Sequence, residues 1–144
     1  MSVTSQLTDL SEIDRVWLAA VLDCEGWIGM SWGYRKHGKA YWPRIGVGNT
    51  DYRLIKRLMD LTGVLSVRHY ISKNPNAKEQ WHWKSDKRSD VDRILKAALP
   101  YLILKREQAE AILSLPGWHV LDKPARANVH DICRRLNKKG RMVA

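Results

Sequence analysis

The sequence contains no phenylalanine, and only two of its 144 residues are cysteine. Cys24 and Cys133 are far apart and form no CxxC pair, which argues against a disulfide framework or a zinc knuckle and favours a reducing compartment. No apolar run approaches the ~20 residues that span a bilayer, and the first ten residues contain neither a basic nor an apolar signal region. We therefore expect neither a membrane protein nor a secreted one.

Acidic residues are scarce relative to basic ones. The chain has 25 Lys and Arg against 15 Asp and Glu, a net charge of +10 and a pI near 9.9. This balance predicts a polyanionic partner, and nucleic acid fits better than a membrane surface. With 144 residues, 44% of them hydrophobic, the chain is long enough for one core, so residues 1–144 are predicted to be a single domain. Most of the seven tryptophans, several of which fall in alternating segments, are expected in that core.

Hydrophobic spacing predicts the order helix, hairpin, helix, hairpin, helices. Ser11 is expected to cap a first helix that ends at Gly26, with apolar positions at helical spacing: Ile13, Val16, Trp17, Ala20, Val21 and Cys24. Further helices are predicted after residues 49–51, from Ser89 or Asp90 with a break at Pro100, and over residues 124–138. The predicted strands are residues 27–34, 41–48, 64–72 and 80–85, the first two joined by the basic loop 35–40. The fold class is therefore α+β, with a four-stranded antiparallel sheet covered by helices on one face and open on the other.

The first helix ends in the segment LAAVLDCEG, residues 18–26, although a helix dipole disfavours acids at its C-terminus. This segment resembles the nine-residue signature of the LAGLIDADG homing endonucleases: four residues match outright, and Glu25 replaces the second aspartate. Ala20 stands where glycine is usual, and Cys24 occupies a usually small position. The family order αββαββα matches the predicted order, and VGNTD and LPYLILKREQAEAIL resemble its strand-to-helix junction and late helix. The resemblance covers residues 12–115, followed by a link and an extra C-terminal helix in 116–144 whose LNKKG resembles the ends of small bacterial and phage members.

The resemblance implies a saddle-shaped sheet and a site-specific, metal-dependent double-strand DNA endonuclease. Glu25 and the backbone carbonyl of Cys24 are expected to bind Mg²⁺, or Mn²⁺ or Ca²⁺ in its place. Lys105 and Asn49 are expected to position or polarise the attacking water and the scissile phosphate. One signature supplies one Glu25, so a homodimer on a near-palindromic site is expected. The expected interface comprises Leu18, Ala19, Val21, Leu22, Asp23 and Gly26.

The outward face of the predicted sheet is expected to enter the major groove, which admits a two-stranded ribbon. Arg44 and Arg68 are the best candidates for paired contacts to guanine. The basic residues of the hairpin loops are expected to reach phosphates. The candidate DNA-binding residues are Ser31, Arg35, Lys36, Arg44, Arg68, Tyr70, Gln80, His82 and Lys84.

Each candidate residue has a structural alternative. Glu25 and Lys105 are equally compatible with a solvated helix acid and a solvated helix lysine, and Asn49 with a helix cap. His130 and Cys133, three residues apart, have the spacing of metal ligands but lack two further partners. The basic segment CRRLNKKGR either adds phosphate contacts from the last helix or forms a free tail.

The function also has alternatives. A non-cleaving relative would keep the fold and bind DNA as a regulator or intron RNA as a maturase, and a plain basic binding module would carry the signature by accident. The resemblance implies a cytoplasmic protein of bacterial or phage type, and an organelle-encoded origin stays open.

Overall fold

A computed structural model describes residues 10–116 and 123–142 of the chain. Its helices are α2 (Glu12–Glu25), α3 (Tyr52–Thr62), α4 (Arg88–Ala98), the 3₁₀ turn η1 (Leu99–Tyr101), α5 (Arg106–Leu113) and α6 (Lys123–Met142). Its strands are β1 (Gly26–Arg35), β2 (Gly38–Asn49), β3 (Val67–Tyr70) and β4 (Gln80–Ser85). The N-terminal segment and much of the link after α5, both considered above, lie outside the described residues.

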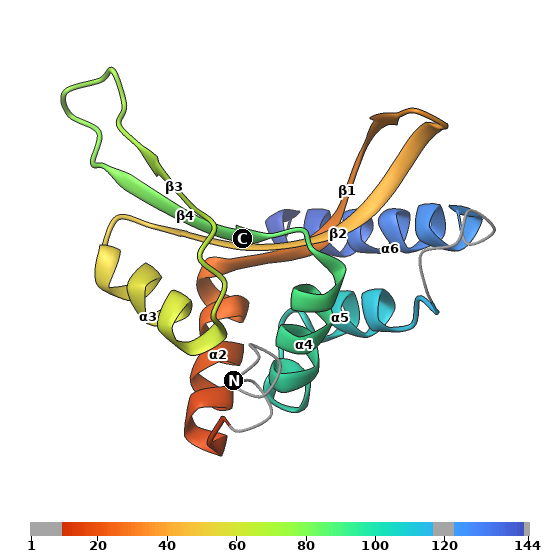
Figure 1. The fold of residues 1–144 in the computed structure, drawn as a ribbon, viewed down its shortest axis with the longest axis horizontal. Helices are drawn as coiled ribbons and strands as arrows, with labels where there is room; N and C mark the ends of the chain where they lie inside the picture. Colours follow the sequence, from red (N-terminus) through yellow and green to blue (C-terminus); the bar gives the residue numbers. More distant parts are fainter. Residues whose placement is uncertain (1–9, 117–122, 143–144) are drawn as a thin grey trace.

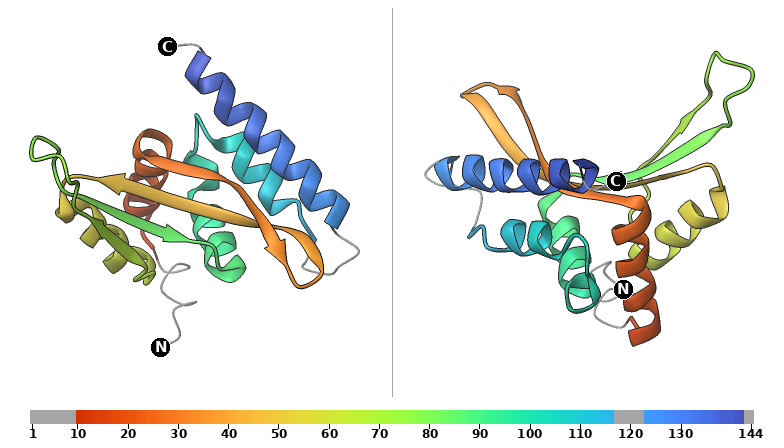
Figure 2. Two further views of the ribbon diagram at one scale, coloured as in Figure 1. Left: turned by 90° about the horizontal axis from the view of Figure 1, so that it is seen from above. Right: turned by 180° about the vertical axis from the view of Figure 1, so that it is seen from behind.

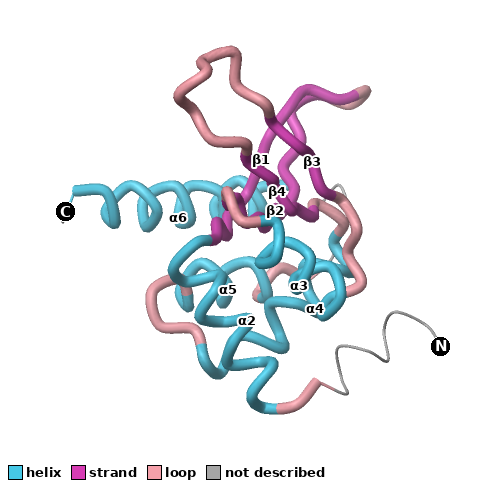
Figure 3. The backbone as a smooth tube through the Cα atoms, turned by 90° about the vertical axis from the view of Figure 1, so that its left-hand side faces the viewer, coloured by secondary structure: helices cyan, strands magenta, loops and turns pink. Residues whose placement is uncertain are grey.

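The four strands form one antiparallel sheet in the order β1-β2-β4-β3. Figure 1 shows α2, α3, α4 and α5 on one side of this sheet, while both hairpins rise away from them. The other face is therefore concave, and the side view in Figure 3 shows the same separation of helices and strands. The predicted α+β class, the order of helices and hairpins along the chain, and the open face of the sheet are confirmed.

Local residue choices explain where the helices begin and end. The Ser11 hydroxyl accepts the Asp14 N–H at 3.1 Å and caps α2, as predicted. Gly26 follows α2 because a β-carbon there would lie 2.7 Å from the Leu22 carbonyl oxygen. Gly63 ends α3 in the left-handed conformation, with φ of 73°, which glycine adopts without strain.

The core lies between the helices and the lower face of the sheet. Ile28, Ile45 and Trp83 point down from the strands and are fully buried against helix residues such as Leu18 and Leu22. The Trp83 indole N–H also donates to the Val64 carbonyl at 3.0 Å, which satisfies its polar atom within the core.

The structure corrects several sequence-based boundaries. β1 and β2 extend to a tight turn at Gly38, whose φ is 101°, so most of the predicted basic loop belongs to the strands. β3 has four residues, shorter than predicted, and α6 continues through Gly140 to Met142. The expectation that most tryptophans are core is wrong for the described residues, since Trp83 is the one fully buried there. None of the described helices is long and apolar enough to cross a membrane.

Helix α6 lies along the free edge of β1 (Figure 2). The Asn137 side-chain amide donates to the Ile28 carbonyl at 3.2 Å, and its oxygen accepts the Gln108 amide at 3.1 Å. Val129 and Cys133, one turn apart, bury the inner side of the helix. The helix therefore covers a strand edge that would otherwise expose unpaired backbone groups.

Replacing Trp83 by Phe tests the core. The change leaves the buried Val64 carbonyl without its donor and removes ring volume, so we expect a loss of about 1–3 kcal/mol in the free energy of unfolding. The matched control is Trp32→Phe, at a side chain that is 49% exposed, with an expected change within about 0.5 kcal/mol. Equal effects of both changes in denaturant unfolding would contradict this description of the core.

Candidate catalytic centre and nucleic-acid interface

The C-terminal turn of α2 is held by the carboxylate of Asp23. Its oxygens accept the backbone N–H groups of residues 103, 104 and 105 at 2.8, 3.1 and 3.0 Å, and the side chain is buried. The Lys105 amine donates in turn to the Asp23 carbonyl. Burial of a carboxylate is unfavourable by itself, and the three N–H donors compensate for it, which explains how an acid is accommodated at a helix C-terminus. Asp23 thus has a structural role, and it brings Lys105 to the end of α2.

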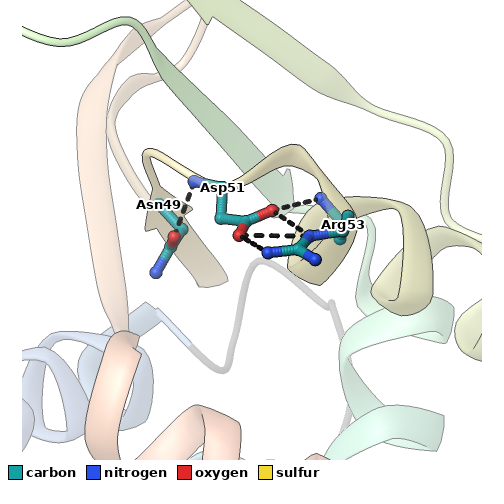
Figure 4. A network of polar contacts seen from close by, with 3 residues as sticks. All are labelled: Asn49, Asp51 and Arg53. Carbon is teal, nitrogen blue, oxygen red and sulfur yellow. Dashed lines mark hydrogen bonds and ion pairs between the residues drawn. The ribbon is translucent and has the colours of Figure 1, made fainter.

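Glu25, two residues further along, lies exposed at the same helix end. Its carboxylate is 3.5 Å from the side-chain amide of Asn49, which belongs to the last position of β2. The Asn49 oxygen accepts the Asp51 N–H at 2.8 Å (Figure 4). Asn49 therefore contacts both Glu25 and the residue that precedes α3. Asp51 caps α3 through the Arg53 N–H at 3.0 Å. Hydrogen bonds from the Arg53 guanidinium, and then from its backbone, lower the pKa of Asp51 to about 2.

The structure therefore brings Glu25, Asn49 and Lys105 to one end of α2, although they come from distant parts of the sequence. No three His, Cys, Asp or Glu side chains in the described part of the chain are grouped as metal ligands. His130 instead lies against the Tyr41 ring, with centroids 5.2 Å apart. Cys133 is buried, burial raises its thiol pKa to about 11, and the thiol donates to the Gln108 carbonyl.

The concave face above Glu25 carries the predicted DNA-binding residues. A trough of about 380 Å³ is lined by Glu25 together with Arg44, Arg68, Tyr70, His82 and Lys84. The register explains this grouping, because His82 pairs with both Arg68 and Gly48, and Lys84 pairs with Gly46. Glycines on β2 leave the basic side chains of neighbouring strands accessible from above.

The remaining candidates lie around this trough. Gln80 pairs with Tyr70 at the outer strand, and its side chain contacts His82 at 3.1 Å. Ser31 pairs with Trp42 in the first hairpin, and the Arg35 guanidinium lies 4.5 Å from the Trp42 ring centre. Lys36 is exposed at the hairpin turn. Five of the candidates thus share the trough and Gln80 contacts one of them, while the DNA-binding role of the whole set stays a prediction.

The predicted interface residues need correction. Leu18, Ala19 and Leu22 are fully buried in the core of their own chain, Val21 is buried, and Asp23 is occupied by backbone donors, so these residues are not available to a partner. Gly26 is partly exposed and stays a prediction. The face of α2 that is exposed carries the other apolar residues at helical spacing: Ile13, Val16, Ala20 and Cys24.

Sequence reasoning left open whether the basic segment after Cys133 adds phosphate contacts from the last helix or forms a free tail, and the structure places its residues through Met142 in α6. Arg134 and Lys138 of α6 line a groove with Trp27, Trp42 and Arg44 of the first hairpin. The spacing of the two basic residues, four apart, indicated that they share a helix face. Nothing in the sequence indicated that this face lies beside β1.

Replacing Asp23 by Asn tests the anchoring of this helix end. An amide has one acceptor oxygen and one donor nitrogen, so it leaves at least one of the three N–H groups without an acceptor. We expect a loss of about 1–3 kcal/mol in the free energy of unfolding, measured with denaturant. The control is Asp60→Asn, at an exposed carboxylate paired with Lys56, with an expected loss below about 1 kcal/mol. A D23N protein as stable as the control would refute the anchor.

The sequence matches no protein-family profile, and no curated protein matches it. Solved structures do. The homing endonuclease I-CvuI, in complex with its target, aligns with a TM-score of 0.69 at 20% identity over 86% of this chain and 82% of that one. The archaeal intron-encoded homing endonuclease I-Vdi141I, in complex with DNA, gives 0.72 at 10% identity over 87% and 84%. The homing endonuclease I-TnaI gives 0.60 at 18% identity over 91% and 98%. This chain has the fold of the LAGLIDADG homing endonucleases, as its signature residues predicted.

Proposed function

We propose that this chain is a divalent-metal-dependent homing endonuclease that cuts both strands of a long, near-palindromic DNA site as a homodimer. The observation that carries the proposal is the position of Glu25, an exposed acid in a concave trough lined by arginine, lysine and histidine. Basic side chains on an open sheet face suit the phosphates and base edges of DNA. An acid among them has no electrostatic benefit for DNA binding, so a catalytic role explains it best.

The groups at the end of α2 fit a hard divalent cation. Glu25 supplies an exposed carboxylate, Cys24 a carbonyl in the last turn of the helix, and Asn49 a side chain 3.5 Å from Glu25. Oxygen ligands of this kind are those that Mg²⁺ and Ca²⁺ prefer. When bound, such a cation would neutralise phosphate charge and lower the pKa of a coordinated water.

The chain's own residues then have definable tasks. The Glu25 carboxylate would bind the cation. Asn49, whose oxygen accepts the Asp51 N–H, limits the orientations of that carboxylate. Lys105 carries a positive charge at the helix end, where it would attract a phosphate and orient water beside it. Its position depends on the Asp23 anchor, because the same carboxylate accepts the Lys105 backbone N–H.

One chain alone supplies one carboxylate to this centre. A cation that acts on a phosphodiester commonly takes one or two carboxylates together with substrate oxygens and water, so the site has room for a second carboxylate. A second copy packed through the exposed face of α2 would bring a second Glu25 to the first. Ala20 and Cys24 are small enough for close helix approach, and Ile13 and Val16, 80% and 44% exposed, would extend the contact. Burial of these side chains would stabilise the dimer.

A non-cleaving relative that binds DNA or intron RNA is the second candidate. Ala20 and Cys24 support it, since both depart from the family signature and both lie on the exposed face of α2. Both are still small, but each is larger than the residue usual at its position, so the two helices and their carboxylates would lie somewhat further apart than in the family. Only the first candidate cuts DNA, so a cleavage assay distinguishes the two.

Glu25→Gln tests catalysis. The amide keeps the shape of the side chain and removes its charge, so we expect Mg²⁺-dependent cleavage of a selected plasmid-library target to fall about 100-fold or more. DNA binding at low salt should persist. The control is Glu110→Gln, at an exposed acid on α5 that pairs with Arg106, with cleavage unchanged. Full cleavage by E25Q would refute the proposed site, and wild-type binding without cleavage would favour the second candidate.

Cys24 provides a test of the dimer. Its thiol is exposed in one chain, while Cys133 is buried with a pKa raised to about 11 and should not react at neutral pH. We expect thiol-reagent labelling of Cys24 to slow about tenfold or more as dilute protein is concentrated, because a partner helix covers it. The control is Ser89→Cys in a Cys24→Ser background, at an exposed position on α4, with a concentration-independent rate. Labelling of Cys24 that does not depend on concentration would refute the interface.

A further inference from the structure

A groove of about 680 Å³ lies above the contact between α6 and the first hairpin. Trp27, Ser31, Trp42 and Arg44 line it from the sheet, and Arg134 and Lys138 line it from the helix. The groove is formed by ordered elements on both sides. Asn137 ties α6 to the Ile28 carbonyl of β1, and Gln108 of α5 holds Asn137 in place.

The lining of the groove suits an anion. It contains two arginines and a lysine and no aspartate or glutamate, although Arg44 Nη2 lies 3.6 Å from the carboxylate of Asp86, an exposed acid outside the lining. An exposed ion pair of this kind is weak, so Arg44 can exchange it for a phosphate. The Trp42 indole N–H and the Arg44 Nε–H are both buried and have no hydrogen-bond partner. Buried donors without acceptors cost free energy unless a ligand supplies the acceptors. The groove therefore offers positive charge and unused donors to a ligand with several acceptor oxygens.

The groove is also continuous with the trough that contains Glu25. Trp27 and Arg44 line both cavities. In the view from above, α6 flanks the first hairpin along its length (Figure 2). An anion in the groove would thus adjoin a ligand lying on the concave face, as neighbouring phosphates of one polymer do.

We infer that α6 is an outer wall of the DNA-binding surface, and that the groove between α6 and β1 holds backbone phosphates of the duplex. This inference rests on the proposed function and adds a contact outside the sheet. Arg134 and Lys138 neutralise phosphate charge from the helix side, while Arg44 and the Trp42 N–H donate from the sheet side. These contacts are to the backbone, so they strengthen binding to every DNA sequence and select none.

The test measures the salt dependence of binding to a fluorescent duplex of arbitrary sequence, about 30 base pairs long, by anisotropy. Each phosphate contact contributes about 0.9 to the slope of log affinity against log salt, so Arg134→Ala with Lys138→Ala should make the slope shallower by about 1.8. The charge-matched control is Lys56→Ala with Lys96→Ala, at exposed positions on α3 and α4 beneath the sheet. Its slope should equal that of the wild type. The charge-keeping variant R134K/K138R should retain most of the wild-type slope.

The outcomes separate this inference from the proposed function. Steep wild-type salt dependence with an unchanged slope in R134A/K138A would overturn the role of α6 and leave the proposed function standing. Equal losses in R134A/K138A and in the control would also overturn it, since net charge alone would then explain the effect. A wild-type protein that does not bind the duplex at low salt would overturn both.

Discussion

The carboxylate of Asp23 is the contact on which the rest of the site depends. By accepting three consecutive backbone N–H groups, it joins the end of α2 to the turn that precedes α5. Because Lys105 is the last residue of that turn, its amine is placed at the Asp23 carbonyl. Gly26 then lets β1 leave α2 directly, with no room for a side chain against Leu22. One buried acid thus sets the relative positions of the helix end, the sheet and a positive charge.

The second acid of the same turn has the opposite environment. Glu25 remains exposed, and Asn49 is its hydrogen-bond partner in the described part of the chain. A negative charge at a helix C-terminus opposes the helix dipole, so Glu25 is not explained by a gain in folding stability. Asp23 therefore has a structural role, whereas Glu25 is free for the catalytic role that we propose for it. The exposed apolar face of α2 completes this account, since a second chain covering it would place two such acids together.

The sequence predicted the helices and strands better than it predicted which of them pack against each other. The strand 80–85 and the helix after Asp51 are where alternation and capping residues place them, because those signals are local. Local signals could not show which face of α2 packs against the core. Apolar residues occur on both sides of this helix, and only the packed structure shows that Leu18 and Leu22 face the core while Ile13 and Val16 do not. The position of α6 depends on Asn137 and Ile28, 109 residues apart, a contact for which the sequence carries no local signal.

The central claim is that two chains meet through the exposed face of α2 and so bring two Glu25 carboxylates to one centre. Ala20→Cys in a Cys24→Ser background tests it most directly, by mild oxidation of the DNA-bound protein and denaturing electrophoresis without reductant. The account predicts a covalent dimer that still cleaves its target in the presence of Mg²⁺. A protein that cleaves DNA yet yields no covalent dimer, or a covalent dimer in which cleavage is lost while A20C remains active when reduced, would contradict it.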